Sequence, residues 1–215
     1  MKYLLFFFLF FLSGCRSDKK YHDEDKEIVV KKNDSADYFS QIQNFRKKIN
    51  EEFINPEKSP LTEEDLKTFK GLKFFPPDSL FKVEARFVRT DNEKPFFMLT
   101  TTTRTPVYTK FGELQFMLSG NNYTLNLYQN TEIILTRGYE DYLFLPFTDL
   151  TNGEETYGGG RYIDMRIPEG NTVIIDFNKA YNPYCAYNKK YSCPLVPSEN
   201  NLDIEIRAGV KKFKK

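Results

Sequence analysis

The sequence predicts a mainly β (α+β) fold, an antiparallel β-sandwich or barrel-like sheet with two N-terminal helices packed on it. Apolar residues first recur with a helical period, between Tyr38 and Phe53, and from Phe81 onward the period changes to two. The later segments are short, nearly evenly spaced and separated by turn residues, which is typical of sandwiches and barrels. We therefore expect one globular domain over residues 37–215, long enough to bury a core.

The two predicted helices precede the strands. The first is expected between Tyr38 and Phe53, and the apolar residues on its predicted inner face are Phe39, Ile42, Phe45, Ile49 and Phe53. Asn55-Pro56 ends it, since proline cannot continue a helix. The second should begin after Thr62, a capping residue followed by three acidic residues, and end at Gly71.

The predicted strands share the alternation of apolar and polar residues that marks a half-buried sheet. Between Phe81 and Phe87 this alternation is regular, and Gly120-Asn121-Asn122 is a strong turn signal before another strand. The segments expected as strands are 81–87, 97–103, 105–110, 113–118, 123–127, 133–135, 142–145, 162–167, 172–177 and 202–206.

The first residues resemble a bacterial lipoprotein signal. Lys2 precedes an apolar run, and Leu12-Ser13-Gly14-Cys15 resembles a lipobox, which implies removal of residues 1–14 and lipidation of Cys15. An ordinary secretory signal or a short membrane anchor is the alternative. Residues 15–36 are rich in mixed charge and predict a disordered tether. We expect a protein of the bacterial cell envelope, held outside the cytoplasm by its lipid.

Composition excludes several classes of function. Lys and Arg number 31 and Asp and Glu 30, so no net field favours a nucleic-acid partner. The single histidine, His22, lies in the predicted tether, which argues against a Ser-His-Asp hydrolase and against zinc. We therefore expect no metal and no cofactor.

Two cysteines remain once Cys15 is assigned to lipidation. Outside the cytoplasm an even pair favours a disulfide between Cys185 and Cys193. Such a bridge closes a loop of about nine residues and would contribute about 2.5 kcal/mol in the chain-entropy model. Free structural thiols are the alternative, because Cys-x7-Cys is not a spacing of zinc ligands.

A glycine-rich loop is the first part of the candidate site. Tyr157-Gly158-Gly159-Gly160-Arg161 leaves backbone N–H groups uncovered, so it could cradle an anion while the guanidinium holds a carboxylate or phosphate. It matches no phosphate-loop motif. The alternatives are a tight turn or bulge, with Arg161 paired internally to Asp176 or Glu155.

The second part of the candidate site follows a predicted strand. Asp176 and Asn178 flank Phe177, and their spacing places both on one face, where they could converge with Arg161 and Tyr181. Alternatively they cap the next turn. The full set of candidate ligand-binding residues is Glu155, Tyr157, Gly158, Gly159, Gly160, Arg161, Asp176, Asn178, Tyr181, Asn182 and Asn200.

Several motifs together resemble one family. They include Phe69-Lys70-Gly71-Leu72, Leu145-Pro146-Phe147-Thr148-Asp149, Glu155 through Tyr162, Ala180-Tyr181-Asn182-Pro183 and Ile206-Arg207-Ala208-Gly209. From about Phe39 onward the chain resembles the bacterial and archaeal family called domain of unknown function 1684. The resemblance implies no activity or substrate, because the family has none assigned.

These observations predict an envelope lipoprotein whose β-rich domain binds a polar small molecule, sugar, peptide or other partner through a loop site in its C-terminal third. One alternative is a metal-independent, hydrolase-like enzyme with Asp176 or Glu155 as acid or base. Another is a purely structural envelope module. No catalytic residue is assigned.

Overall fold

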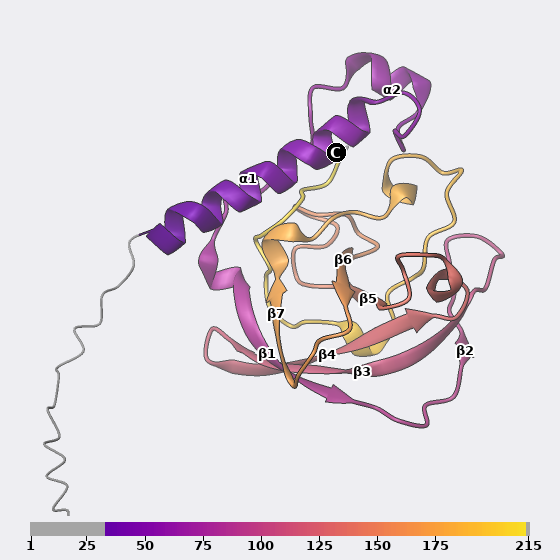
Figure 1. Cartoon of the computed structure of the whole chain (residues 1–215). Helices are drawn as coiled ribbons and strands as arrows, with labels where there is room; N and C mark the ends of the chain where they lie inside the picture. The colour runs from indigo at the N-terminus through magenta and orange to yellow at the C-terminus, as the bar shows by residue number, and fades with distance from the viewer. Residues whose placement is uncertain (1–32, 214–215) are drawn as a thin grey trace, which may run out of the picture.

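The computed structural model describes residues 33–213 and contains one curled antiparallel sheet (Figure 1). Its strands are β1 (Lys82–Arg89), β2 (Phe96–Phe97), β3 (Val107–Leu118), β4 (Asn121–Asn130), β5 (Tyr142–Phe147), β6 (Arg161–Arg166) and β7 (Thr172–Asp176). The seven strands follow the order β6-β5-β4-β3-β1-β7, with β2 paired to β3, and form a half-barrel. The predicted mainly β, antiparallel, barrel-like fold is confirmed.

The helices differ from the prediction in position. Helix α1 (Asn33–Ile54) begins earlier than expected and takes in the end of the predicted tether. Its most buried positions are Tyr38, Ile42, Arg46 and Phe53. The buried face of α1 therefore differs from the predicted one. It includes Tyr38 and Arg46, whose polar groups form hydrogen bonds outside the helix.

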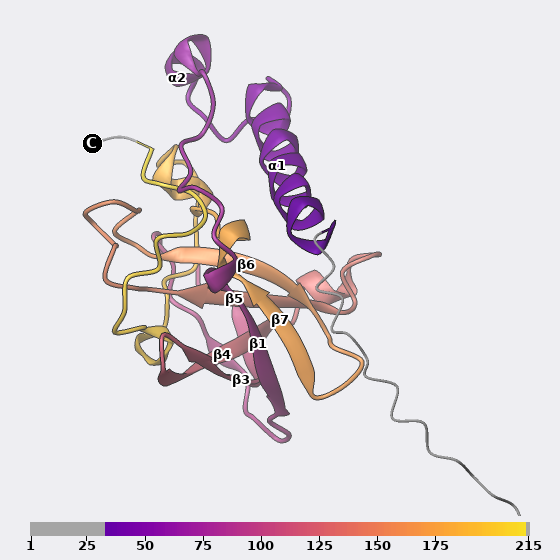
Figure 2. The same ribbon diagram turned by 90° about the vertical axis from the view of Figure 1, so that its left-hand side faces the viewer.

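Of the two α-helices in the described part of the chain, only α1 packs on the barrel. Helix α2 (Glu63–Thr68) buries none of its residues and lies beyond the end of α1, away from the strands (Figures 1 and 2). Its predicted start is confirmed, since Thr62 accepts a hydrogen bond from the backbone N–H of Asp65 at 3.1 Å. Among residues 33–213, no helix combines the length and the apolar character needed to cross a membrane. Residues 1–14, Cys15 and most of the predicted tether lie outside the described residues.

The hydrophobic core fills the concave side of the sheet, and the C-terminal segment covers its open side. Leu202, Ile206 and Ala208 are buried among the strand residues. The strand expected at 202–206 does not form, because this backbone makes isolated bonds instead of a continuous ladder: the N–H of Leu202 donates to Thr148 at 2.8 Å, and the carbonyl of Ile204 accepts from Leu150 at 3.1 Å. The N–H of Ile206 donates to Asp149 at 3.1 Å, and its carbonyl accepts from Arg161 at 2.8 Å.

Three further strand predictions need correction. The segments predicted at 105–110 and 113–118 form the single strand β3, with a bulge between Lys110 and Gly112. A Cβ at Gly112 would lie 2.4 Å from the ring of Phe87, so this close approach needs glycine. The strand expected at 97–103 shrinks to β2, and residues 133–135 form a 3-10 turn.

Candidate functional site

Arg161 lies in a closed internal network. It begins β6, is 0% exposed, and its Nη2 lies 2.8 Å from Oδ2 of Asp149. The guanidinium also donates to the carbonyls of Ile206 and Ala208. The other oxygen of Asp149 accepts from the N–H and hydroxyl of Thr151. Arg161 therefore pairs with Asp149 rather than with Asp176 or Glu155, and it faces the core.

Asp176 and Asn178 attach α1 to the barrel. Tyr38 of α1 donates to Oδ1 of Asp176 at 2.9 Å, and Asn178 donates to the hydroxyl of Tyr38 at 2.9 Å. Asn178 also exchanges hydrogen bonds with the backbone of Asp78, at 2.7 and 2.9 Å. Burial first, and then the Asp176 charge, raises the pKa of Tyr38, so its hydroxyl stays protonated. Arg161, Asp176, Asn178 and Tyr181 do not meet at one point.

The glycine-rich loop forms a tight turn. The N–H of Gly160 donates to the carbonyl of Tyr157 at 3.1 Å. Of the three consecutive glycines only Gly160 has a positive φ, +87°, and a Cβ there would lie 2.7 Å from the carbonyl oxygen of Phe147. Gly158 and Gly159 have no positive φ, although a Cβ at Gly159 would lie 2.6 Å from the ring of Tyr157. This geometry agrees with the turn alternative.

Two other predicted site residues have internal partners. Asn200 is 0% exposed; it accepts from the N–H of Asn126 at 2.8 Å and donates to the carbonyl of Pro146 at 2.6 Å. Glu155 lies nearer the surface and pairs with Arg207 at 3.1 Å. Asn200 therefore joins neighbouring strands, and Glu155 joins its loop to the C-terminal segment.

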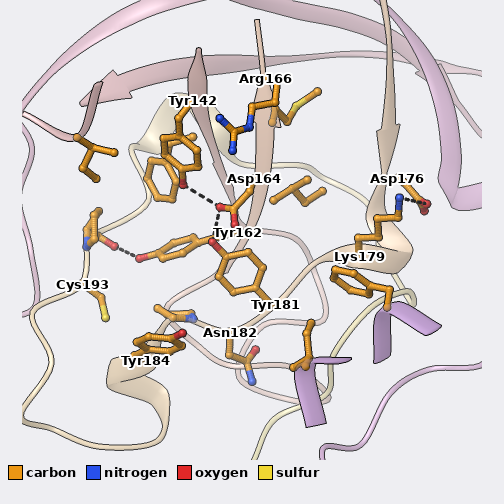
Figure 3. Close-up of a pocket in the computed structure, with 18 of the residues that line it drawn as sticks. Tyr142, Tyr162, Asp164, Arg166, Asp176, Lys179, Tyr181, Asn182, Tyr184 and Cys193 are labelled. Carbon is orange, nitrogen blue, oxygen red and sulfur yellow. Dashed lines mark hydrogen bonds and ion pairs between the residues drawn. The ribbon is translucent and has the colours of Figure 1, made fainter. Parts of the chain in front are cut away.

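A large groove lies elsewhere, between α1 and the face of β5 and β6 that points away from the core (Figure 3). Its volume is about 1080 Å³, and eight of its lining residues are tyrosines. Three residues of the predicted site, Asp176, Tyr181 and Asn182, line it. The groove thus combines aromatic surface with polar groups, as small-molecule sites do.

Asp164 lies at the centre of this groove (Figure 3). Its Oδ1 accepts the hydroxyl of Tyr142 at 2.8 Å and that of Tyr181 at 2.5 Å. Strand alternation places Asp164, Tyr162 and Arg166 on the outer face of β6. Tyr142 is the cross-strand partner of Arg166 and so reaches Asp164 diagonally. The backbone of Tyr181 exchanges two hydrogen bonds with Tyr162, which brings its ring beside β6.

The hydroxyls of Tyr142 and Tyr181 stay protonated and therefore act as hydrogen-bond donors. Burial is the main reason that the pKa values of Tyr142 and Tyr181 are raised, and the Asp164 charge raises them further. Within residues 33–213, Asp164 has no salt-bridge partner. The nearest basic residue on its strand, Arg166, pairs instead with Asp141 at 2.6 Å. Asp164 therefore presents a carboxylate with one hydrogen-bonded oxygen and one that accepts no described hydrogen bond.

The sequence reasoning missed Asp164 and Tyr142. The available signal was the alternation of Tyr162, Asp164 and Arg166 with the apolar Ile163 and Met165. This pattern predicts a polar outer face but not a groove, because α1 supplies the opposite wall from more than a hundred residues away in the sequence.

Cys193 lines the groove, and Cys185 lies next to it. Both are free thiols in this structure rather than the predicted disulfide, but the backbone N–H of Cys185 donates to Sγ of Cys193 at 3.1 Å. The hydrogen bond from Cys193 lowers the pKa of Cys185 to about 6, and the same bond raises the pKa of Cys193. The hydroxyl of Tyr157 lies 3.8 Å from Sγ of Cys185. No group of three or more potential metal ligands occurs among the described side chains.

The family comparison covers most of this region. The family described as protein of unknown function (DUF1684) matches residues 67–211, more than half of the chain. The chain belongs to the DUF1684 family. The match includes Asp164, Tyr181 and the glycine-rich loop, whereas α1, which forms the other wall of the groove, precedes the matched part of this DUF1684 chain.

A solved structure shares the DUF1684 chain's fold. The solution NMR structure of an uncharacterised protein from gene locus rrnAC0354 of Haloarcula marismortui is 33% identical in sequence, with a TM-score of 0.64. The similarity covers 83% of this chain and 96% of the archaeal one. A search of curated proteins finds no match.

Proposed function

We propose that this DUF1684 protein is a lipid-anchored protein of the bacterial cell envelope that binds a polar small molecule in the groove between α1 and β6. In this proposal Asp164 accepts hydrogen bonds from the ligand, and tyrosine rings cover its less polar faces. Asp176, Tyr181 and Asn182 belong to the same groove. Arg161, Asn178, Asn200 and Gly160 support the fold around it.

One observation carries the binding proposal, namely the exposed carboxylate of Asp164 inside a tyrosine-lined groove of about 1080 Å³. The groove is large enough for a sugar or a short peptide. The network of Arg161 is buried and offers no exposed group to a ligand, whereas Asp164 is exposed and keeps one oxygen available. This contrast favours the groove over the glycine-rich loop.

Thermal unfolding of the full chain in detergent, with a panel of sugars, peptides, amines and anions, tests the proposal. A ligand at a hundred times its Kd should add about 2.7 kcal/mol to stability. Asp164→Asn should weaken that ligand's binding, while Asp203→Asn, an exposed carboxylate outside the groove, should not. The proposal fails if no compound binds, or if both variants bind the ligand as well as the parent chain.

The anchoring proposal rests on the Leu12-Ser13-Gly14-Cys15 sequence and has its own test. Expressed in bacteria, the chain should sediment with membranes and carry acyl groups on Cys15, detected by mass spectrometry. Cys15→Ser should lose both properties, whereas Cys185→Ser should keep them. A chain that keeps Cys15 but carries no acyl group on it would refute lipidation.

A further inference from the structure

We infer that the groove selects ligands that carry a protonated primary amine, bound between the Asp164 carboxylate and the surrounding tyrosine rings. This inference rests on the binding function proposed above and names the chemical class of its ligand. Three features of the described residues support it: an unpaired negative charge, a second carboxylate on the opposite wall, and acceptors that lack donors.

The first feature is the charge of Asp164. The two tyrosine hydroxyls both contact Oδ1 and bring no positive charge, so the carboxylate keeps its full charge. Most basic side chains that line the groove already have an interaction partner. Arg166 pairs with Asp141 at 2.6 Å and Lys179 with Asp176 at 3.8 Å. A cation from a ligand would compensate the charge that remains.

Two other basic residues of the lining are also held by neighbours. Lys82 lies over the ring of Tyr38, 4.6 Å from its centre, and Arg104 donates to Ser192 at 3.0 and 3.2 Å. Lys48, on α1, is the remaining lysine of the lining. The part of the groove near Asp164 therefore offers few cations that could compete with an amine.

The second feature is Glu52 on α1, across the groove from β6. No salt bridge among the described residues includes it. Tyr184 is 44% exposed, and carboxylates on both walls affect its pKa. This pKa is raised by burial first, then by the charge of Glu52, and further by Tyr191 and Asp164. Two carboxylates thus act on the space around this ring, which favours a cation there and disfavours an anion.

The third feature is a shortage of donors. Asn182, 1% exposed, lines the groove below Tyr181, and its Oδ1 has no hydrogen-bond partner among the described residues (Figure 3). The second oxygen of Asp164 likewise accepts no described hydrogen bond. A primary ammonium supplies three N–H donors, which suits such acceptors better than a quaternary amine does.

The aromatic rings favour a cation as well. Figure 3 shows the rings of Tyr142, Tyr162 and Tyr181 around Asp164, and Tyr184 at the edge of the same space. An ammonium group near tyrosine faces is attracted by the ring electrons. A neutral sugar of the same shape would stack on the rings without this attraction.

Glucosamine and glucose form a matched pair of probes for the full chain. Calorimetry at low salt and about pH 6, where amines are protonated, should give a Kd for glucosamine at least tenfold below that for glucose. Choline, a cation without N–H donors, should bind more weakly than glucosamine. Asp164→Asn should remove most of the difference between glucosamine and glucose. Glu52→Gln, on the opposite wall, should reduce it too, and Asp203→Asn should leave it unchanged.

The outcomes separate this inference from the function that it rests on. If glucose binds as tightly as glucosamine, the groove binds polar ligands but the selection of amines is wrong. The same conclusion follows if the Asp164→Asn and Glu52→Gln proteins, shown by circular dichroism to be folded, prefer glucosamine over glucose as strongly as the parent chain does. If none of the probes and none of the wider panel binds, the binding function itself falls.

Discussion

At the first position of β6, Arg161 carries a positive charge where water cannot reach it. Its neighbours compensate this charge: Asp149 supplies the counter-ion, and the carbonyls of Ile206 and Ala208 accept from its two Nη groups, while its buried Nε has no partner among the described residues. A buried pair of this kind adds little net stability compared with apolar residues, but losing one partner is costly because the other charge stays buried. The arrangement explains why this arginine follows the glycine turn.

Replacing Arg161 by methionine should lower the free energy of unfolding by about 3–5 kcal/mol, since Asp149 would be left buried and unpaired. Arg166→Met is a matched control on the same strand, because its partner Asp141 is exposed and the loss should be below about 1 kcal/mol. Denaturant unfolding monitored by circular dichroism measures both. Equal effects of the two substitutions would contradict the structural role given to Arg161.

The thiol of Cys185 should react as a thiolate near neutral pH. The hydrogen bond from Cys193 lowers its pKa to about 6, so in the reduced protein its alkylation rate should rise with pH around that value and level off above it. Cys193 is 6% exposed and its pKa is raised, so it should react slowly. Iodoacetamide labelling with peptide mapping measures each rate, and Cys185→Ser should remove the fast one. A midpoint near the ordinary value of 9.0 would contradict the expected shift.

Among the elements, α1 depends on few polar contacts for its position on the barrel. Tyr38 joins it to Asp176 and Asn178, and Arg46 donates to the carbonyl of Phe75 at 2.8 Å. Because α1 forms one wall of the groove, these contacts also set the width of the proposed binding site.

Tyr38→Phe should cost about 1–3 kcal/mol, because buried polar atoms of Asp176 and Asn178 would each lose a partner. Amide hydrogen exchange should become faster in α1 before it does in β3 or β4. Tyr139→Phe, at a tyrosine that is 45% exposed, should change neither quantity. Unchanged exchange in α1 of the Tyr38→Phe protein would show that the helix is held without the hydrogen bonds of Tyr38.

Elements could be predicted from the sequence where the pattern is local. The alternation in β1 and the cap at Thr62 depend on neighbouring residues, and these predictions agree with the structure. The segment 202–206 was misassigned because it makes isolated bonds to the backbone of residues 148–150 and to the side chains of Asp149 and Arg161, which no local pattern reveals. The candidate site is harder to predict than the strands. Asp164 belongs to a site because Tyr181 and α1 lie close to it, and only the fold brings them to β6.

At the scale of the whole molecule, the half-barrel has two strand edges and one open side. The edge of β6 is partly covered by Tyr181, and the C-terminal segment fills the open side. Full closure of the sheet would leave no edge, but it would also remove the space between β6 and α1. The incomplete barrel therefore accounts for both the groove and the dependence of the core on residues that follow the last strand.

That dependence orders events during synthesis. Chains emerge from the ribosome N-terminal end first, at about 5–20 residues per second. All seven strands precede Leu202, Ile206 and Ala208, which complete the core and hold the Arg161–Asp149 pair. The nascent polypeptide consequently cannot bury its internal charge until translation has passed these residues. Folding to the final structure is thereby delayed until all seven strands have been synthesised.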